Sequence, residues 1–266
     1  MSKYLTNKHL DDFKKKGFFI IRNFFKIKKL RNIKKEIYFS LKKGKFNKNH
    51  IYYENKKKSK IIRRIERITE NSKSVYKLLN EKRLMLIVGS LMQDKFVLFK
   101  DKLNLKLPGG EGFEPHVDGH FTWIDKKKKI HKGWQEYSNN FLNVVIPLEK
   151  TSKKNGCLHL ADLYNTKKYL GNSWKKINSK LDYLTPKVKK KYIKSFKFHS
   201  IEQKPGDVLF FDWRVCHLSK KNNSKKSRMI FYVTYAKSKD KKNKIRKKYY
   251  LDKVFSKNPL FMKSIN

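Results

Sequence analysis

The chain has 266 residues, enough for one domain with a sizeable core, and its aromatic content of 14% excludes a disordered basic chain. Its formal net charge of +46 raises the question of nucleic-acid binding. However, only nine of the 68 basic residues are Arg, the residue favoured for phosphate recognition, and the lysines occur along most of the chain. We therefore interpret most of this charge as a solvated surface and keep a nucleic-acid-binding protein as an alternative.

The N-terminal part of the chain alternates between helical and strand patterns. Thr6 can cap a helix over residues 7–15, which Gly17 would end. The largely apolar run 17–25 predicts a buried strand. Apolar residues at three- and four-residue steps over 27–43 then predict an amphipathic helix with a lysine-rich outer face.

Residues 44–70 are polar and irregular in pattern, and some helix is expected around residues 61–68. A further helix is predicted from Val75 to Met92, with an interruption near Asn80.

From Phe96 onward, short segments rich in Val, Ile, Leu, Phe and Tyr are separated by turn residues. Many short strands after a helical N-terminal third predict a mainly β fold with α-helices. We expect a double-stranded β-helix of the jelly-roll, cupin-like type, braced by the N-terminal helices. The predicted strands cover residues 96–107, 140–149, 157–161, 194–203, 207–212 and 228–236.

No internal repeat is evident, so a single domain is predicted over residues 1–266. A lysine-rich insertion around Trp174 is interpreted either as a lid over the barrel mouth or as a surface excursion. The expected parts of the domain are a mostly helical support (1–95), a jelly-roll core (96–240), the insertion within it (163–193) and a basic C-terminal tail (241–266).

The main chemical signal is a His-x-Asp pair, His116 and Asp118, followed about a hundred residues later by His217. On a strand, side chains two residues apart project to the same face. Two imidazoles and one carboxylate can occupy one face of an octahedral metal, which leaves three positions for a cosubstrate and O₂ at non-haem Fe(II). A His-x-Asp pair alone is weak evidence, and zinc accepts the same ligands, so a zinc hydrolase stays an alternative.

A second signal is Arg228, which opens an apolar strand eleven residues after His217. A buried guanidinium needs an anionic partner. That partner would be either the distal carboxylate of 2-oxoglutarate, with Ser219 adding a hydroxyl, or a structural salt bridge to a carboxylate such as Asp212.

Several segments resemble the phytanoyl-CoA dioxygenase superfamily of Fe(II)/2-oxoglutarate oxygenases, and the likeness covers most of the chain. In chain order they are LTNKHLDDFKKKGFFIIRNFF, KDKLNLKLPGGEGFEPHVD, NVVIPLEKTSKKNGCLHLAD and PGDVLFFDWRVCHLSKKNNSKKSRMIFYVTY. The resemblance implies a dioxygenase that hydroxylates a small molecule and releases succinate and CO₂. It implies Fe(II), 2-oxoglutarate as cosubstrate and O₂, with His116, Asp118 and His217 as iron ligands. Arg228 and Ser219 resemble the clamp on the C5 carboxylate of 2-oxoglutarate.

The resemblance to the family is weaker at other positions. Asn104 and Lys106 match a polar pair near the cosubstrate or substrate, on the strand that precedes His-x-Asp. Trp134 falls where some relatives place a cosubstrate-contacting Trp, although core packing explains it equally well. Val117 stands where many relatives have Gln. The loop after Asp118 shows no substrate signature, and we interpret His120 in it as an exposed residue.

The remaining features concern compartment and partners. Cys157 and Cys216 form no CxxC motif, which suits a reducing, cytoplasmic compartment. No run of about 18 apolar residues occurs, so no membrane span is expected. Lys102 and Lys106 slightly favour an anionic small-molecule substrate, while nucleic acid is not the expected partner. The substrate itself and the oligomeric state stay open.

Overall fold

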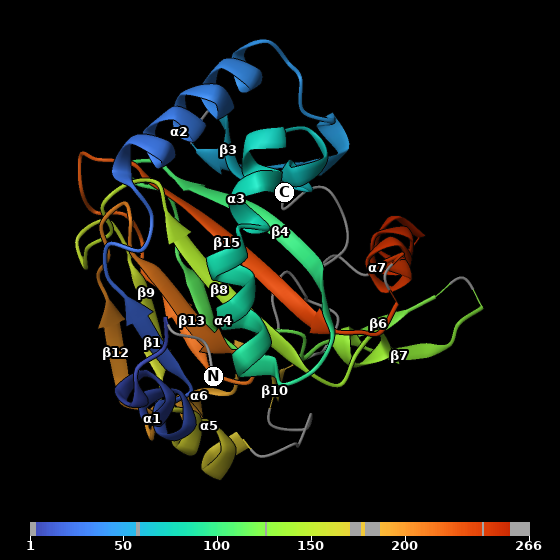
Figure 1. The fold of residues 1–266 in the computed structure, drawn as a ribbon. Helices are drawn as coiled ribbons and strands as arrows, with labels where there is room; N and C mark the ends of the chain where they lie inside the picture. Colours follow the sequence, from blue (N-terminus) through green and yellow to red (C-terminus); the bar gives the residue numbers. More distant parts are fainter. Residues whose placement is uncertain are drawn as a thin grey trace.

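The computed structural model describes residues 4–56, 59–125, 127–170, 177–178, 187–240 and 242–255, and it has two antiparallel sheets braced by helices (Figure 1). The larger sheet has the strand order β1 (Phe18–Ile21), β13 (Val208–Asp212), β8 (Phe141–Pro147), β15 (Arg228–Lys237), β4 (Phe96–Lys106), β3 (Ser59–Glu66), β2 (Ile51–Lys56). The smaller sheet has the order β12 (Phe198–Ile201), β9 (Leu158–Ala161), β14 (His217–Ser219), β5 (Phe113–His116). Two short hairpins pair β6 (Thr122–Ile124) with β7 (Ile130–Lys132), and β10 (Ile177–Asn178) with β11 (Lys187–Val188).

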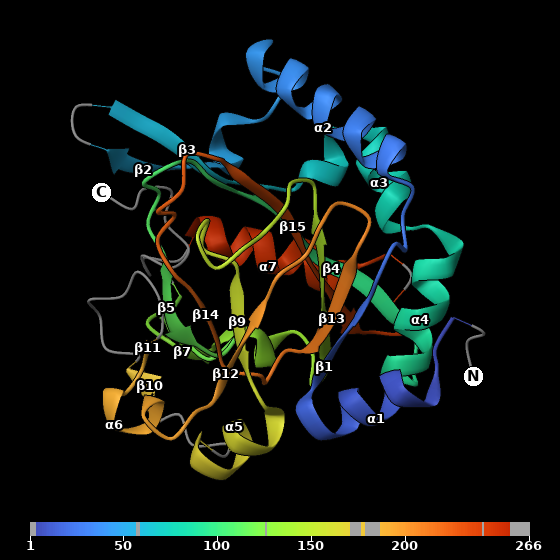
Figure 2. The ribbon, with the colours of Figure 1, turned by 90° about the vertical axis from the view of Figure 1, so that its left-hand side faces the viewer.

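The described helices lie mostly outside the sheets. They are α1 (Asn7–Lys16), α2 (Ile27–Lys42), α3 (Lys73–Leu79), α4 (Lys82–Met92), α5 (Leu163–Leu170), α6 (Lys190–Ile193) and α7 (Lys244–Phe255), with short 3-10 turns η1 (Lys48–His50), η2 (Ile68–Glu70) and η3 (Gly133–Glu136). Figure 2 shows α3 and α4 on one side of the larger sheet and β5, β9 and β14 on the other. This is the predicted jelly roll with helical bracing.

The N-terminal elements confirm the predicted order. Thr6 caps α1 by accepting a hydrogen bond from the backbone N–H of His9, and Gly17 ends the helix with φ +83°. A Cβ at Gly17 would lie 2.7 Å from Leu163, so the strand β1 can start at this point only with glycine before it. The predicted interruption at Asn80 separates α3 from α4.

The expected helix at residues 61–68 is wrong, because this segment forms most of the strand β3. Ile61, Ile65 and Ile68 have a helix-like spacing in the sequence. In the fold, however, Ile65 lies opposite Leu103 of β4, and β2 pairs along the other edge of β3. Backbone pairing with a long neighbouring strand therefore outweighs the local pattern.

Alternation along the central strands separates two environments. On β15, Met229, Phe231 and Val233 are buried in the core that packs against the bracing helices. Ile230 belongs instead to the core between the two sheets. Since successive strand residues point to opposite faces, Arg228, Tyr232 and Thr234 share the inner face with Ile230. The polar residues of the central strands therefore face the smaller sheet.

The segment expected as a basic C-terminal tail contains the helix α7, which packs on the protein. Tyr249 and Tyr250 of α7 are buried in an aromatic cluster with Phe99 of β4. Lys253 pairs with Glu66 of β3 at 2.5 Å, and Glu66 also lies 3.4 Å from Lys100. Burial alone would raise the pKa of Glu66, but the neighbouring cations outweigh burial and hold this pKa well below its usual range.

Replacing Glu66 with Gln is expected to lower the free energy of unfolding by about 3–5 kcal/mol, because buried cations would lose their counter-charge. The folded-state pKa of Glu66 is depressed, so its stabilisation is present above the unfolded-state pKa of about 4.3 and is lost as pH falls. Denaturant titrations measure both effects. Glu111→Gln is the control, because Glu111 pairs with Lys221 at an exposed site worth less than about 1 kcal/mol. Equal effects of the two substitutions would contradict this role of Glu66.

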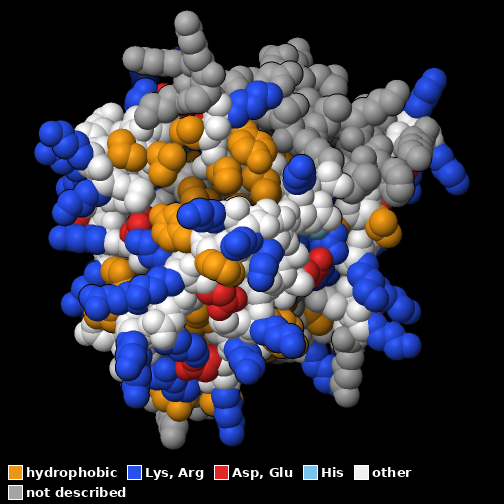
Figure 3. Space-filling view, turned by 90° about the horizontal axis from the view of Figure 1, so that it is seen from above, with side chains coloured by type: hydrophobic (Ala, Val, Ile, Leu, Met, Phe, Trp, Pro, Cys, Tyr) orange, Lys and Arg blue, Asp and Glu red, His pale blue; other side chains and the backbone are white. Residues whose placement is uncertain are grey.

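The surface carries the lysines as a distributed charge. Figure 3 shows Lys and Arg side chains spread around the outline of the upper face, with few acidic side chains among them. Among the described residues, no helix has the length and apolar character needed to cross a bilayer. Trp174 and residues 171–176 and 179–186 of the predicted insertion lie outside the described residues, so the choice between a lid and a surface excursion is left open.

Candidate active site

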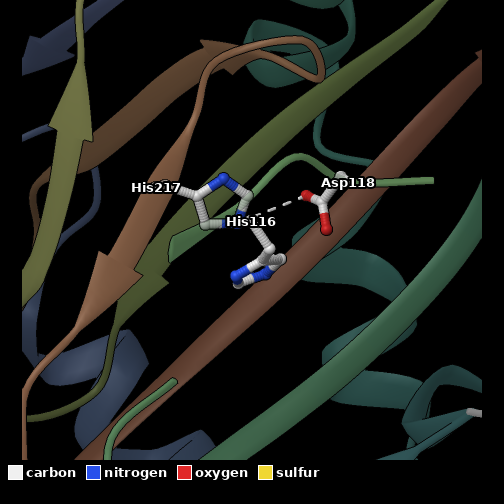
Figure 4. A group of neighbouring side chains, drawn as sticks. All are labelled: His116, Asp118 and His217. Atoms are coloured by element: carbon white, nitrogen blue, oxygen red, sulfur yellow. Dashed lines mark ion pairs between the residues drawn. The ribbon is translucent and has the colours of Figure 1, made fainter. Parts of the chain in front are cut away.

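His116, Asp118 and His217 come together between the two sheets (Figure 4). His116 ends β5 and His217 opens β14, and these two residues are direct partners in the antiparallel pairing. Their ring centroids lie 4.2 Å apart, and Nε2 of His217 is 3.7 Å from a carboxylate oxygen of Asp118. One potential ligand atom from each residue lies within 4.8 Å of the others. The predicted set of three metal ligands is therefore assembled by the fold.

Both histidines are held in the tautomer that a metal ligand needs. Nδ1 of His116 lies 2.7 Å from the carbonyl oxygen of Glu114, and Nδ1 of His217 lies 2.9 Å from that of Val215. A carbonyl can only accept, so each Nδ1 carries the proton and each Nε2 keeps its lone pair. Burial, and then the His217 ring, lower the pKa of His116 to about 3, and burial also lowers the pKa of His217. Both rings are therefore neutral at physiological pH.

Asp118 is ionised and fixed in place by two neighbouring strands. Burial alone would raise its pKa, but electrostatic interactions with His217, Lys102 and His116 outweigh burial and lower it. Asn143 of β8 donates a hydrogen bond from Nδ2 to Asp118 at 2.8 Å. Thr234 of β15 in turn donates to Oδ1 of Asn143 at 2.7 Å. This chain of hydrogen bonds orients the carboxylate toward the histidines, as outer hydrogen-bond partners of metal ligands do.

Arg228 is a buried cation with unused donors. Its side chain is 1% exposed, and Nη1 donates to the carbonyl of Gly156. Its Nε and Nη2 have no hydrogen-bond partner among the described residues. The alternative salt bridge is wrong, because Asp212 pairs with Arg214 at 2.6 Å. Nε–H and Nη2–H lie along one edge of the guanidinium, where they can donate two hydrogen bonds to one carboxylate.

Lys106 lies opposite Arg228 in the pairing of β4 with β15. Its Nζ donates to Oγ of Ser219 at 2.9 Å, which brings together three residues that the sequence placed near the cosubstrate. Burial, and then the charges of Arg228 and Arg63, lower the pKa of Lys106 to about 6. An anion between Arg228 and Lys106 would relieve this repulsion, so the pocket fits the distal carboxylate of a dicarboxylate.

A sequence model of the family described as phytanoyl-CoA dioxygenase (PhyH) matches residues 13–230. The chain belongs to the phytanoyl-CoA dioxygenase family. Among relatives of this dioxygenase, 2-aminoethylphosphonate dioxygenase of uncultured bacterium HF130_AEPn_1 is 28% identical, over 87% of this chain and 82% of that protein. Methylphosphonate hydroxylase of Gimesia maris is 25% identical, over 71% of this chain and 64% of that protein.

Solved structures show the same fold. EctD from S. alaskensis, solved with 2-oxoglutarate and 5-hydroxyectoine, superposes with a TM-score of 0.66 at 17% identity, over 88% of this chain and 76% of that chain. The predicted family, the jelly roll and the dioxygenase class are thus confirmed. EctD from S. alaskensis was solved both with 2-oxoglutarate and with bound Fe, the two groups predicted from the sequence. Neither the nucleic-acid-binding nor the zinc-hydrolase alternative gains support from them.

The sequence did not settle the surroundings of Trp134 in this dioxygenase. Trp134 is buried among aromatic rings, 5.6 Å from Phe99 and 5.3 Å from Phe141 between centroids. Phe99 lies seven residues before Lys106 on β4, roughly 23 Å along the strand. Trp134 therefore packs far from the Lys106 end of β4, but its backbone N–H donates to the carbonyl of Gly119, next to Asp118, at 3.2 Å. Its contact with 2-oxoglutarate stays a prediction.

The loop after Asp118 differs from expectation at His120, which is buried, not exposed. Its ring stacks against Trp213 with centroids 5.3 Å apart. Asn104, the other predicted polar residue of β4, is buried, and its Oδ1 has no hydrogen-bond partner among the described residues. Asn143, Thr234 and Tyr232 were not predicted, although each occurs at an alternate position of an otherwise apolar strand.

Proposed function

We propose that this family member is an Fe(II)- and 2-oxoglutarate-dependent dioxygenase that hydroxylates a small molecule and releases succinate and CO₂. One observation carries the proposal: three neutral or anionic potential metal ligands converge in the same interior that holds the buried Arg228 guanidinium, and two of its donors have no hydrogen-bond partner in the described ranges. Metal and dicarboxylate sites in one cavity are what this reaction requires.

Each residue has a definite task in this proposal. Nε2 of His116, Nε2 of His217 and the Asp118 carboxylate would hold the iron, and their backbone and Asn143 partners keep them oriented. Bound iron would supply the activation of O₂ coupled to decarboxylation of 2-oxoglutarate. Arg228 would bind the C5 carboxylate through Nε and Nη2.

We further propose an organophosphonate as the substrate class. The two relatives described above are named for 2-aminoethylphosphonate and methylphosphonate. The inner face of the larger sheet also favours an anion, because Lys102, Lys106 and Arg228 lie on it, while Asp118 would be taken up as a metal ligand. A phosphonate substrate gives this excess of positive charge a counter-charge.

The test uses anaerobically prepared protein loaded with Fe(II). Titration with 2-oxoglutarate should produce the weak visible charge-transfer band of a chelated Fe(II) centre. Under air, succinate release should then be stimulated by 2-aminoethylphosphonate or methylphosphonate, with propionate and betaine as comparison substrates. Stoichiometric zinc in the isolated protein together with no band would refute the iron and 2-oxoglutarate proposal. A band with stimulation by propionate alone would refute only the substrate class.

A further inference from the structure

Three lysines of β4 point to the inner face of the sheet, and two of them have polar partners. Lys100 lies 3.4 Å from a carboxylate oxygen of Glu66. Lys106 donates to Ser219 at 2.9 Å. Lys102, which lies between them, has neither a carboxylate within 4.0 Å nor a hydrogen bond in the part of the chain that the structure describes. The ammonium group of Lys102 can therefore pair with an anion from another molecule.

Lys102 lies close to the metal ligands. Its Nζ is 5.3 Å from the centroid of the Tyr232 ring, and the two residues are opposite each other in the pairing of β4 with β15. Its charge contributes to the electrostatics of His116, Asp118 and His217 alike. One face of the Lys102 ammonium is therefore covered by an aromatic ring, while the charge acts on the metal site.

The environment of Lys102 disfavours an uncompensated charge. Burial, and then the charges of Lys100 and Arg64, lower the pKa of Lys102 to about 8, although Asp118 acts in the opposite direction. Lys100, Arg64 and Lys253 already share the single carboxylate of Glu66. A partly desolvated cation in such surroundings is stabilised when an anion binds beside it.

The site assigned to 2-oxoglutarate lies elsewhere along the same strands. Arg228 precedes Tyr232, the partner of Lys102 on β4, by four residues on β15, so the Cα atoms of Arg228 and Tyr232 lie roughly 13 Å apart. This separation along the strands leaves room for one anion at Arg228 and another at Lys102.

We propose that Lys102 binds the anionic head group of the substrate, a phosphonate, and so positions the substrate beside the iron. This inference rests on the proposed function, because it assumes that Arg228 holds the cosubstrate. The lysine would donate a charge-assisted hydrogen bond to a phosphonate oxygen, while the Tyr232 ring fixes its direction.

The experiment measures the affinities for the two anions separately in Lys102→Met, Lys102→Arg and wild type. Anaerobic Fe(II) protein is titrated with 2-oxoglutarate by the charge-transfer band. The Fe(II)·2-oxoglutarate complex is then titrated calorimetrically with 2-aminoethylphosphonate and with methylphosphonate. Lys60→Met is the matched control, because Lys60 is an exposed lysine on the adjacent strand β3. Thermal unfolding of every variant checks that it is folded.

We expect Lys102→Met to weaken phosphonate binding by about 10- to 100-fold, the change that loss of a charged hydrogen bond produces, with 2-oxoglutarate affinity within about twofold of wild type. Lys102→Arg should recover most of the affinity, and Lys60→Met should change neither ligand. Unchanged phosphonate binding in Lys102→Met would overturn the inference, as would wild-type protein that binds 2-oxoglutarate but neither phosphonate. Weaker 2-oxoglutarate binding in Lys102→Met would instead assign this lysine to the cosubstrate. Wild type that binds no 2-oxoglutarate would overturn the proposed function itself.

Discussion

Replacing Asp118 with Ala is expected to lower iron affinity by more than about 100-fold and to abolish 2-oxoglutarate turnover. Loss of an outer hydrogen-bond partner of a metal ligand already costs about 10- to 100-fold in metal affinity, and Asp118 would be a direct ligand. It is also the carboxylate of the three-residue set, so its loss leaves two neutral imidazoles facing a divalent cation. Iron content after anaerobic loading and desalting measures the first effect, and succinate release measures the second.

The control is Asp94→Ala. This substitution removes the same negative charge as Asp118→Ala, but Asp94 pairs with Lys237 and is not one of the proposed ligands. Asn143→Ala is a graded companion: it removes the 2.8 Å hydrogen bond to Asp118 and should reduce iron affinity less than Asp118→Ala does. A folded Asp118→Ala protein that still binds iron and turns over 2-oxoglutarate would show that the three-ligand assignment is wrong.

The sequence was sufficient to propose the candidate site, because the residues of the site form short local patterns. His116 and Asp118 lie two residues apart, and Ser219 and Arg228 follow His217 within eleven residues, so these residues could be grouped before any fold was known. In the structure, β5 ends at His116, and Asp118 lies just beyond it. What could not be read was the long-range pairing that puts His217 directly opposite His116. Antiparallel register between strands a hundred residues apart depends on the packing of the whole sheet.

The failures have similar causes. The isoleucines of residues 61–68 fit a helix locally, and only the neighbouring strands β2 and β4 select the strand. The helix α7 was not predicted, because its segment is rich in lysine. Tyr249 and Tyr250 form the apolar face through which this helix packs on Phe99. The sequence could not distinguish Lys102 from the other lysines. The structure distinguishes it, because Lys100 contacts Glu66 and Lys106 contacts Ser219.

Replacing Arg228 with Met should raise the dissociation constant for 2-oxoglutarate by about 100-fold or more, while iron binding is retained. Nε and Nη2 of Arg228 are buried and have no hydrogen-bond partner in the part of the chain that the structure describes, so a carboxylate placed there gains two charged hydrogen bonds of about 1.5–3 kcal/mol each. Met keeps much of the apolar volume but offers no donor. Titration of the charge-transfer band with 2-oxoglutarate measures the change, and iron content of the same samples separates it from loss of the metal.

Two further measurements distinguish a cosubstrate clamp from a structural arginine. Arg228→Lys keeps the charge but not the paired N–H groups, so it should recover only part of the affinity. 2-Oxoglutarate should raise the thermal midpoint of the wild-type iron protein and leave that of Arg228→Met nearly unchanged, because only a ligand that binds the folded state stabilises it. A variant that is strongly destabilised without 2-oxoglutarate, yet binds it with wild-type affinity, would make Arg228 a residue of the core. The two buried donors that lack a partner among the residues described here argue for the opposite result, since a guanidinium that served only the core would have had its N–H groups satisfied by the protein itself.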